Sequence, residues 1–431
     1  MSKNKWYSLL AMLVISVMVL SACGGAAATQ APAASTQVEI FSWWTGGGEA
    51  AGLAAMQKVF EAKYPNITFV NAAVAGGAGT NAKAVLATRL QAGDAPDSWQ
   101  AHAGEATFAY ADAKQIAPLD DFFKSSGFGD VLPATLIPLI SKDGHPYSVP
   151  VNIHRSNVMW YNPKVLSAAG VSVPTTWDEF FAACDKIVAT GKLCISLGPQ
   201  WTAEHLFENV MIGSLGADKW NGLWTGSGDW SSADVTAALD NYAKVLSYAN
   251  PDHASFTDWQ PATKLVTDGD AAFNIMGDWA DGYLENAAPD GLGLKAHTDF
   301  DWAPTPGTKG IFVFLSDSFV LPANAMHADA TTAWLTVAAS KEGQEAFNPV
   351  KGSICARTDC DQSLFNEYLQ SAGKDWLADT VVGSLTHEVV GNPVWNDKVN
   401  TALGLFLADP TKVADFQAAL VAACKSDGAC K

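Results

Sequence analysis

Four short stretches of the sequence combine polar side chains with aromatic or apolar ones, several of them at the ends of expected strands. They are Trp43-Trp44, Trp99-Gln100-Ala101-His102, Gly277-Asp278-Trp279 and Leu315-Ser316-Asp317-Ser318. An indole offers a large, rigid apolar face at little entropic cost. Carboxylate, amide and imidazole groups form hydrogen bonds, and these are stronger when one partner is ionised. Together such groups suit a ligand with apolar ring faces and a fringe of hydroxyls, such as a hexose.

The composition indicates a globular protein and excludes one class of partner. The 431 residues are 48% hydrophobic and 16% charged, which is enough apolar surface for a large core or two domains. The net charge is −18 and no stretch forms a basic stripe, so nucleic acid is not an expected partner. The 16 tryptophans are many for a chain with 26 basic residues. A lone tryptophan more often packs in a core, so it is the recurrence beside polar groups that favours binding.

Motifs of common catalytic sites are absent from the sequence. It contains no GxxxxGK[ST], HExxH, GxSxG or EF-hand loop, and Gly391 stands where a zinc helix beginning at His387-Glu388 would need its second histidine. The Gly76-Gly77-Ala78-Gly79 stretch lacks the lysine of a phosphate cradle and is more typical of a turn or hinge lip. We therefore expect binding groups, with no catalysis, metal or cofactor. A pair of acids for glycoside hydrolysis stays open, because any of the 44 Asp and Glu could meet in space.

The N-terminus has the pattern of an export signal followed by a tether. Lys3 and Lys5 precede an uncharged run over residues 9–20, which is too short for a permanent membrane span. The run ends in Leu20-Ser21-Ala22-Cys23, which resembles the lipobox of bacterial lipoproteins. We expect residues 1–22 to be the signal peptide, Cys23 to be lipidated and residues 23–37 to form a flexible tether, so that only lipid contacts the membrane. The alternative is a plain secretory signal cleaved near Ala22, with Cys23 free.

The cysteine count agrees with an exported lipoprotein. Seven cysteines are present, and assigning Cys23 to lipid leaves three neighbouring pairs: Cys184 with Cys194, Cys355 with Cys360, and Cys424 with Cys430. We expect these pairs to form disulfides, which persist in the oxidising environment outside the cytoplasm. Zinc binding is the weaker interpretation, because the pairs lack CxxC spacing and no histidine cluster stands beside them.

The hydrophobic pattern alternates strands with helices. Residues 38–44 and 67–70 read as strands, and a helix between them carries Leu53, Met56 and Phe60 at helical spacing. A second helix is expected at about 81–91, and Thr176-Trp177-Asp178-Glu179 opens another with a capping-box pattern. This order predicts an α/β fold with parallel sheets, which bind ligands at the carboxyl ends of their strands.

The chain resembles the solute-binding proteins of carbohydrate ABC transporters, extracellular solute-binding family 1, and in particular the glucose- and mannose-binding members of thermophilic bacteria. The stretches that carry the resemblance are residues 39–44, 150–161, 272–279, 315–319 and 350–353. It implies a two-lobed clamp of the periplasmic-binding-protein type II, in which each lobe is a mostly parallel sheet flanked by helices. The N-terminal lobe would comprise residues 38–150 and about 305–350, and the C-terminal lobe residues 151–304 and about 351–431.

The resemblance also implies which side chains contact the sugar. The implied set is Trp43, Trp44, Gln100 and His102, with Trp259 and Trp279 as stacking surfaces, Asp317, Lys351 and His387 as hydrogen-bonding groups, and Asn152 and His154 as further candidates. A longer, glycine-rich turn at residues 45–48 leaves open whether Trp43 or Trp44 is the contact. Lys351 could instead be solvated, and His387 could form a surface pair with Glu388. Asp278 is expected to brace the backbone, and Arg155 to form a structural ion pair.

The function implied is that of the sugar-binding subunit of an ABC importer, and not that of an enzyme. The clamp would close on a monosaccharide, glucose or else mannose or galactose, and dock as a monomer on the transmembrane subunits of the permease. The protein would be exported and lipid-anchored at the outer face of the cytoplasmic membrane. Two alternatives remain: a binder of a short oligosaccharide or another polar solute on the same fold, and a secreted carbohydrate-active enzyme.

Overall fold

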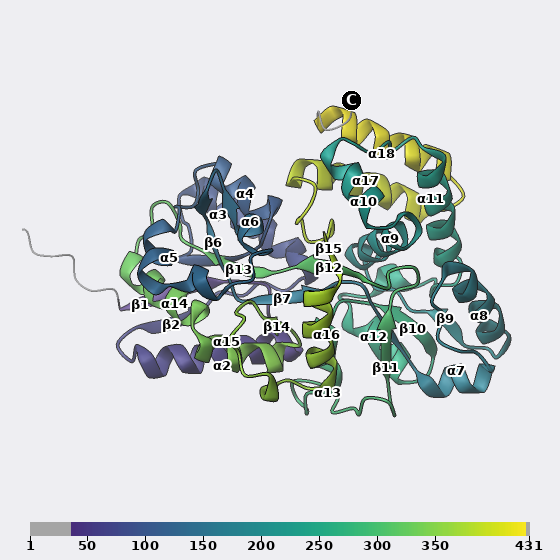
Figure 1. The fold of residues 1–431 in the computed structure, drawn as a ribbon, viewed down its shortest axis with the longest axis horizontal. Helices are drawn as coiled ribbons and strands as arrows, with labels where there is room; N and C mark the ends of the chain where they lie inside the picture. Colours follow the sequence, from purple (N-terminus) through teal and green to yellow (C-terminus); the bar gives the residue numbers. More distant parts are fainter. Residues whose placement is uncertain (1–35, 428–431) are drawn as a thin grey trace, which may run out of the picture. The chain divides into compact units, whose positions relative to one another are not determined.

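The computed structural model describes residues 36–427 of the chain (Figure 1). The expected signal peptide, the lipidated Cys23 and most of the tether lie outside the described residues, as does Cys430. Within residues 36–427, no helix has the length and apolar character needed to cross a membrane.

The first sheet has five strands in the order β2-β1-β3-β13-β6. Their bounds are β2 Thr68–Asn71, β1 Gln37–Phe41, β3 Ser98–His102, β13 Asp317–Val320 and β6 Ser148–Pro150. Strand β1 pairs in parallel with β2 and β3, whereas β13 runs antiparallel to both β3 and β6. A single reversed strand, β13, therefore lies among four that share one direction.

Two four-stranded sheets also contain one reversed strand each. One has the order β11-β8-β10-β9 and the other β14-β7-β12-β15. The bounds are β11 Asp301–Pro304, β8 Val158–Tyr161, β10 Ala271–Ile275, β9 Leu193–Ile195, β14 Ile354–Cys355, β7 Asn152–Arg155, β12 Ile311–Leu315 and β15 Thr380–Gly383; a hairpin joins β4 Ser141–Lys142 to β5 His145–Pro146. In these sheets only β8 and β7 are reversed. The predicted α/β class is therefore confirmed. The sheets are mixed and not mostly parallel as expected, because each reversed strand lies between two neighbours: four of the ten neighbouring strand pairs in these three sheets are parallel and six are antiparallel.

The chain passes through the β14-β7-β12-β15 sheet on its way between the other two sheets. It leaves the first sheet at β6, enters β7 and continues into β8 of the second sheet, and it returns from β11 through β12 to β13. Strands β7 and β12 are antiparallel neighbours (Figure 1). The site described below includes residues of both crossing strands. The lobe boundaries at 150/151 and 304/305 remain a prediction.

Helices surround the sheets. The α-helices are α2 Gly47–Lys63, α3 Thr80–Ala92, α4 Glu105–Asp112, α5 Asp120–Ser126, α6 Ile137–Ile140, α7 Pro163–Ala169, α8 Trp177–Ala189, α9 Gln200–Leu215, α10 Ala217–Thr225, α11 Ala233–Leu246, α12 Gln260–Thr267, α13 Trp279–Glu285, α14 Ala328–Ala339, α15 Lys341–Lys351, α16 Glu367–Ala378, α17 Pro393–Ala408 and α18 Val413–Asp427. The 3-10 turns are η1 Gly77–Gly79, η2 Phe128–Val131, η3 His253–Ser255 and η4 Gln362–Leu364. The expected helix at 81–91 is α3, whereas the first expected strand is shorter than predicted, since β1 ends at Phe41 and leaves Trp43 and Trp44 beyond it.

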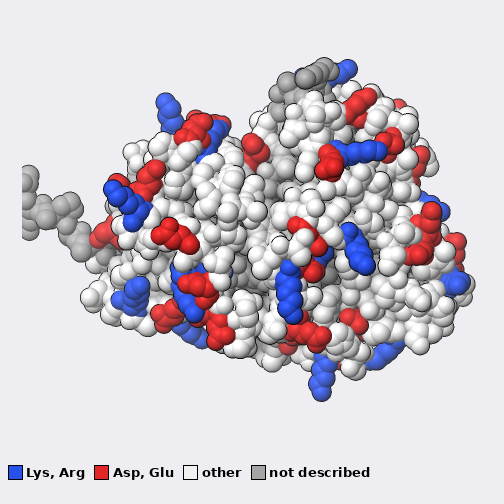
Figure 2. Space-filling view, viewed as in Figure 1, with Lys and Arg blue, Asp and Glu red and all other residues white. Residues whose placement is uncertain are grey.

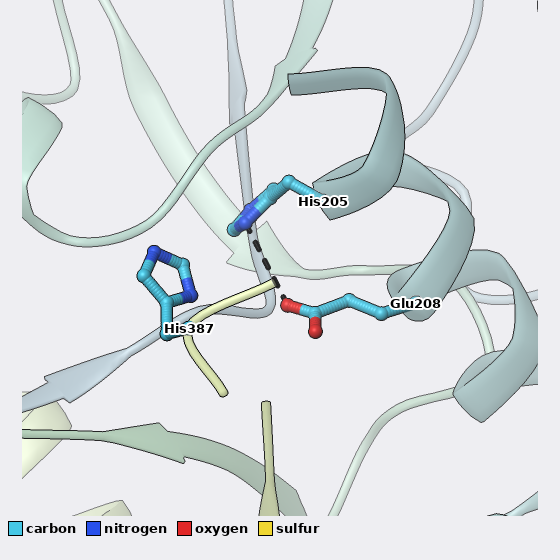
Figure 3. Close-up of side chains that lie close together, drawn as sticks. All are labelled: His205, Glu208 and His387. Atoms are coloured by element: carbon cyan, nitrogen blue, oxygen red, sulfur yellow. Dashed lines mark ion pairs between the residues drawn. The ribbon is translucent and has the colours of Figure 1, made fainter. Parts of the chain in front are cut away.

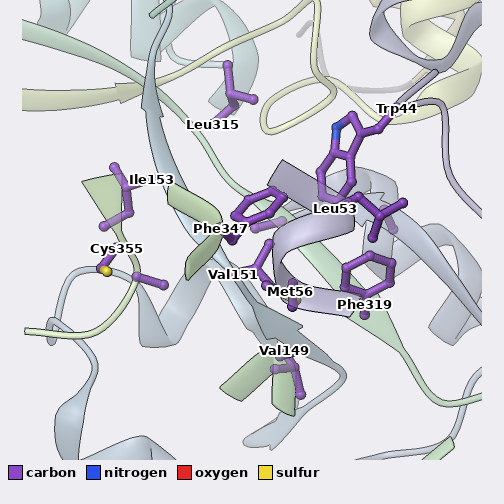
Figure 4. Packing of buried hydrophobic residues seen from close by; sticks show 14 of the residues in the cluster. Trp44, Leu53, Met56, Val149, Val151, Ile153, Leu315, Phe319, Phe347 and Cys355 are labelled. Atoms are coloured by element: carbon purple, nitrogen blue, oxygen red, sulfur yellow. The ribbon is translucent and has the colours of Figure 1, made fainter. Parts of the chain in front are cut away.

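The apolar residues form two clusters of buried side chains. The first contains residues of β1 and of α2, α14 and α15, and the second contains residues of α8, α9, α11 and β10. Figure 4 shows part of the first cluster, in which Trp44 packs against Phe347 and Phe319 with ring centroids 4.9 and 5.8 Å apart. Trp44 is therefore a core residue.

Local signals in the sequence correspond to local structure in two places. Thr176 and Glu179 form the predicted capping box at the start of α8, where the Thr176 hydroxyl accepts a hydrogen bond from the Glu179 backbone N–H at 3.2 Å. Disulfides join Cys184 to Cys194 and Cys355 to Cys360, as predicted, and the first links α8 to β9. The third pair stays a prediction, because Cys430 lies outside the described residues.

Charged residues of both signs are interspersed on the face drawn in Figure 2. The basic side chains on that face form no continuous stripe.

We predict that Thr176→Ala lowers the free energy of unfolding by about 1 kcal/mol, because it removes the hydroxyl that caps α8. Urea unfolding followed by circular dichroism measures the change. Thr88→Ala is the matched control, since Thr88 is exposed in the interior of α3 and donates only to the Ala84 carbonyl of its own helix. Equal stabilities of the two variants would contradict the capping role.

A second prediction concerns Glu204, a buried carboxyl on α9 whose Oε1 atom has no hydrogen-bond partner among the described residues. Burial raises the pKa of Glu204 to about 8. Because the folded pKa lies above the unfolded one, the folded protein loses stability as pH rises from about 5 to about 9. We expect Glu204→Gln to lose less stability than the wild type over this range, in unfolding measurements at both pH values. Parallel stability profiles would contradict this.

Candidate functional site

Eight of the eleven predicted site residues line one pocket. They are Trp43, His102, His154, Trp259, Trp279, Asp317, Lys351 and His387. Glu49, Gly77, Ala78, Trp201 and Leu315 complete the lining and were not predicted as site residues. The space between these side chains is about 320 Å³, part of which is open to solvent.

The pocket residues come from the ends of many elements. Trp43 follows β1, and His102 is the last residue of β3, so both lie at carboxyl ends of parallel strands, as predicted. The crossing strands contribute His154 from within β7, and Asp317 begins β13 directly after β12. Helix ends supply Trp279, at the start of α13, and Lys351, at the end of α15. No single segment could form this site, because its walls meet only when the sheets are assembled.

Asp317 is held by polar side chains that do not line the pocket themselves. Its Oδ1 atom accepts a hydrogen bond from Gln100 Nε2 at 2.7 Å, and its Oδ2 atom accepts one from Asn152 Nδ2 at 2.8 Å. Asn152 Oδ1 also accepts the Asp317 backbone N–H at 2.7 Å. Gln100 Oε1 accepts the backbone N–H of Trp43 at 3.1 Å, so one amide orients both Trp43 and Asp317. Gln100 and Asn152 therefore position the pocket residues from behind.

The charge of Asp317 is stabilised although the side chain is 3% exposed. Burial acts to raise the pKa of Asp317, but the hydrogen bond with His154 and the charge of Lys351 outweigh it and hold the pKa far below its usual range. His154 Nε2 lies 3.4 Å from Asp317 Oδ2, and its Nδ1 atom pairs with Asp278 Oδ1. An ionised carboxylate is therefore present in the pocket at neutral pH, as a strong hydrogen-bond acceptor.

Lys351 faces the same carboxylate from helix α15. It is 1% exposed, which excludes the alternative of a solvated lysine, and its Nζ atom lies 3.2 Å from His154 Nε2 and 3.3 Å from Glu49 Oε1. Glu49 reaches it because α2 packs closely on α15: a Cβ built on Gly48 would lie 2.7 Å from the Val350 carbonyl oxygen. Burial raises the pKa of Glu49, partly offset by Lys351. The pocket thus offers a cationic donor beside acidic acceptors.

The remaining walls are indoles and neutral imidazoles. Trp43 packs edge-on against His102 with centroids 5.0 Å apart, and Trp201 lies 6.3 Å from Trp279. Burial lowers the pKa of His102 to about 4, so this ring is neutral at pH 7, and its Nδ1 atom has no hydrogen-bond partner among the described residues. His387 is neutral for the same reason, because burial lowers its pKa well below the usual value. Neutral imidazoles can both donate and accept hydrogen bonds at the pocket wall.

The contacts of Glu388, Asp278 and Arg155 decide between the roles that the sequence left open. Glu388 pairs with Lys83 at 2.8 Å and not with His387. The His387 side chain lines the pocket. Asp278 accepts a hydrogen bond from the Arg155 backbone N–H at 2.8 Å, as a backbone brace. The Arg155 guanidinium pairs with Asp375 and Asp379, which confirms a structural ion pair. Of the two adjacent indoles, Trp43 lines the pocket and Trp44 lies behind it in the core.

A buried trio of His205, Glu208 and His387 lies beside the pocket, with one potential ligand atom of each within 4.8 Å of the others. Figure 3 shows His205 and Glu208 on one helix and His387 on a separate segment facing them. The Glu208 carboxylate already accepts hydrogen bonds from the hydroxyls of Ser156 and Ser384 at 2.6 and 2.8 Å and from two backbone N–H groups. Because these donors occupy the carboxylate, the arrangement fits a structural hydrogen-bond network rather than a metal centre.

The sequence gives little local signal for the missed residues. Trp201 lies in the first turn of α9, away from any strand end, and α9 is buried on nearly all sides. Glu49 stands in the glycine-rich start of α2, where the first turn is expected to be exposed. Each of these residues joins the pocket only through the packing of distant elements.

Comparisons with known proteins agree with this architecture. The family described as bacterial extracellular solute-binding protein matches residues 38–345. An uncharacterized ABC transporter extracellular-binding protein of Pyrococcus horikoshii is 36% identical over 385 residues, which are 87% of this chain and 85% of that protein. A probable sugar-binding periplasmic protein of Rhizobium meliloti is 36% identical over 380 residues, which are 84% of this chain and 86% of that protein.

Solved structures show the same fold at low sequence identity. The bacterial solute receptor AcbH, described as having an exclusive preference for β-D-galactopyranose, has a TM-score of 0.78 at 18% identity and covers 91% of this chain and 99% of its own. The fold is therefore the α/β clamp expected from the sequence. With a family match over most of its length and relatives 36% identical to it, the chain belongs to the bacterial extracellular solute-binding proteins.

Proposed function

We propose that the protein is the sugar-binding subunit of an ABC importer and that its pocket holds one monosaccharide, with glucose as the first candidate. The observation that carries the proposal is the pocket lining itself: four indoles enclose a space bordered by the Asp317 carboxylate, the Lys351 ammonium group and neutral imidazoles. Indole faces match the apolar C–H faces of a pyranose, and the polar groups match its hydroxyls. Relatives described as probable sugar-binding periplasmic proteins support the same ligand class.

Each polar group has a distinct part in this proposal. Asp317 accepts hydrogen bonds from two ring hydroxyls, while Gln100 and Asn152 keep its carboxylate fixed. Lys351 donates to a hydroxyl oxygen, and His102 and His387 donate or accept according to tautomer. Trp201, Trp259 and Trp279 provide the apolar faces. Because Gln100 and Asn152 orient the Asp317 carboxylate before the ligand arrives, this group loses little entropy on binding.

Delivery follows from a difference in contacts between open and closed forms. A ligand that touches residues carried by both sheets stabilises the closed form, and only this difference in binding energy drives closure. The loaded protein would then dock as a monomer on the transmembrane subunits of a permease, held near them by a lipid on Cys23. The export signal and the lipid on Cys23 are part of the proposal and rest on the sequence pattern alone.

The arrangement of Asp317 favours binding over glycoside hydrolysis. A retaining glycosidase needs a carboxylate free to attack the sugar and a second carboxyl group about 5–5.5 Å away. Both oxygens of Asp317 accept protein hydrogen bonds, and Glu49 is paired with Lys351. Neither group is therefore placed as an unoccupied nucleophile, which supports the role of a receptor.

We predict that Asp317→Ala weakens glucose binding by about 1.5–3 kcal/mol, the usual value for the loss of a charge-assisted hydrogen bond. Isothermal titration calorimetry measures the affinity. The exposed Asp143, in the turn between β4 and β5, provides the control Asp143→Ala, with wild-type affinity expected. An Asp317→Ala variant that is folded and binds glucose like the wild type would remove Asp317 from the site.

We predict that Trp201→Ala costs about 2 kcal/mol or more of glucose affinity if its indole stacks on the sugar ring. Trp201 is only partly buried, so the substitution disturbs the core less than one at Trp279. Trp302→Ala is the matched control, because Trp302 is also partly buried and packs on His297 and Tyr368, outside the pocket. A loss below about 0.5 kcal/mol at Trp201 would show that its indole is not part of the binding surface.

A further inference from the structure

The glycine segment, residues 76–79, lies at the place where the pocket meets the surface. Most pocket residues are buried, and the lining residues that keep partial exposure are Glu49, Gly77, Ala78 and Trp201. Two of these four belong to the glycine segment, and Trp201 packs directly against it. Three of the four partly exposed lining residues therefore lie in or against this segment, and the fourth, Glu49, lies on α2.

Two indoles of the pocket enclose the glycine segment from opposite ends. A Cβ built on Gly77 would lie 2.7 Å from two ring carbons of Trp201, and one built on Gly79 would lie 2.9 Å from a ring carbon of Trp43. Such distances are shorter than any normal van der Waals contact, so neither position accepts a side chain. Ala78 between them has a positive φ of 52°. The backbone of the segment thus fits directly between two walls of the site.

Asp258 forms a further contact across the mouth of the pocket. A Cβ on Gly77 would lie 2.6 Å from Asp258 Oδ1, and Asp258 Oδ1 also accepts the backbone N–H of Trp259 at 2.9 Å. Burial raises the pKa of Asp258, whereas the backbone N–H groups of Trp259 and Gly77 favour its charged form. The carboxylate therefore links the glycine segment to the chain that carries Trp259.

The elements that meet here belong to different sheets. The glycine segment joins β2 of the first sheet to α3, whereas α9 follows β9 and α12 precedes β10 in the second sheet. Contacts of Gly77 with Trp201 and Asp258 consequently depend on the relative placement of the two sheets. They form the part of the pocket that closure would complete.

We propose that the glycine segment is the roof of the pocket, and that its contact with Trp201 and Asp258 limits the ligand to a single sugar ring and retains that ring. This proposal rests on the proposed function of the pocket as a sugar site. It assigns the size selectivity to the backbone of a segment whose glycines have no side chains that could move aside. A disaccharide would place its second ring where Gly77 and Ala78 now lie.

The test compares Gly77→Ala with Gly46→Ala, using glucose and maltose as probes in titration calorimetry. Gly46 lies in the turn before α2, has extended backbone and has no atom within 4 Å of a built Cβ, so its variant should bind like the wild type. We expect Gly77→Ala to weaken glucose binding about tenfold or more, because the added methyl group holds the roof away from Trp201. We also expect the preference of the wild type for glucose over maltose to shrink.

A second variant tests the contact without adding bulk. Asp258→Ala should release glucose several-fold faster in stopped-flow fluorescence, with an unchanged melting temperature in the absence of sugar. If Gly77→Ala and Asp258→Ala both bind and release glucose like the wild type, the proposed role of the glycine segment is wrong, whereas the proposed sugar site is not contradicted. A wild-type protein that binds maltose as tightly as glucose also overturns the roof. A wild-type protein that binds no sugar overturns the proposed function itself.

Discussion

The structure of the site depends on one buried carboxylate. Asp317 stays ionised in a nearly dry environment because Gln100, Asn152 and His154 supply hydrogen bonds that replace those of water. These partners come from β3 and β7, and Asp317 itself begins β13, so the first sheet and the crossing strands must be correctly assembled before the charge is tolerated. An unpaired carboxylate at this depth would cost several kcal/mol. The hydrogen-bond network around Asp317 therefore forms only when the first sheet and the crossing strands are assembled.

Aromatic packing supplies the other half of the site and explains the high tryptophan content. Trp43 lines the pocket while the adjacent Trp44 fills the core beside Phe347, so two consecutive indoles serve recognition and stability separately. Trp279 lies within 5.2–5.7 Å of the rings of His154, His205 and His387. Rings that contact so many neighbours have little freedom to rotate. A rigid wall of this kind favours a ligand of fixed shape over a flexible one.

Much of the fold and part of the site could be predicted from the sequence, for identifiable reasons. Periodicity located α3, the Thr176 capping box located the start of α8, and close spacing located two disulfides, since each of these signals is local. Family resemblance proposed Asp317, Lys351 and His387, and all three line the pocket.

The remainder depends on contacts between segments far apart in the chain. Glu49 is in the pocket because α2 packs closely on α15, and the glycine segment is there because its backbone fits against Trp201. Trp43 faces the pocket, with its backbone N–H bound by the Gln100 side chain 57 residues later. Spacing within one segment carries no information about such partners. The choice between Trp43 and Trp44 could therefore not be made from the sequence.

A crystal structure of the protein with glucose tests the central claim most directly. We expect one pyranose ring in the pocket, with its faces against the indoles and two of its hydroxyls within hydrogen-bond distance of the Asp317 carboxylate. A sugar bound elsewhere, or one in the pocket whose hydroxyls do not reach Asp317, would contradict it.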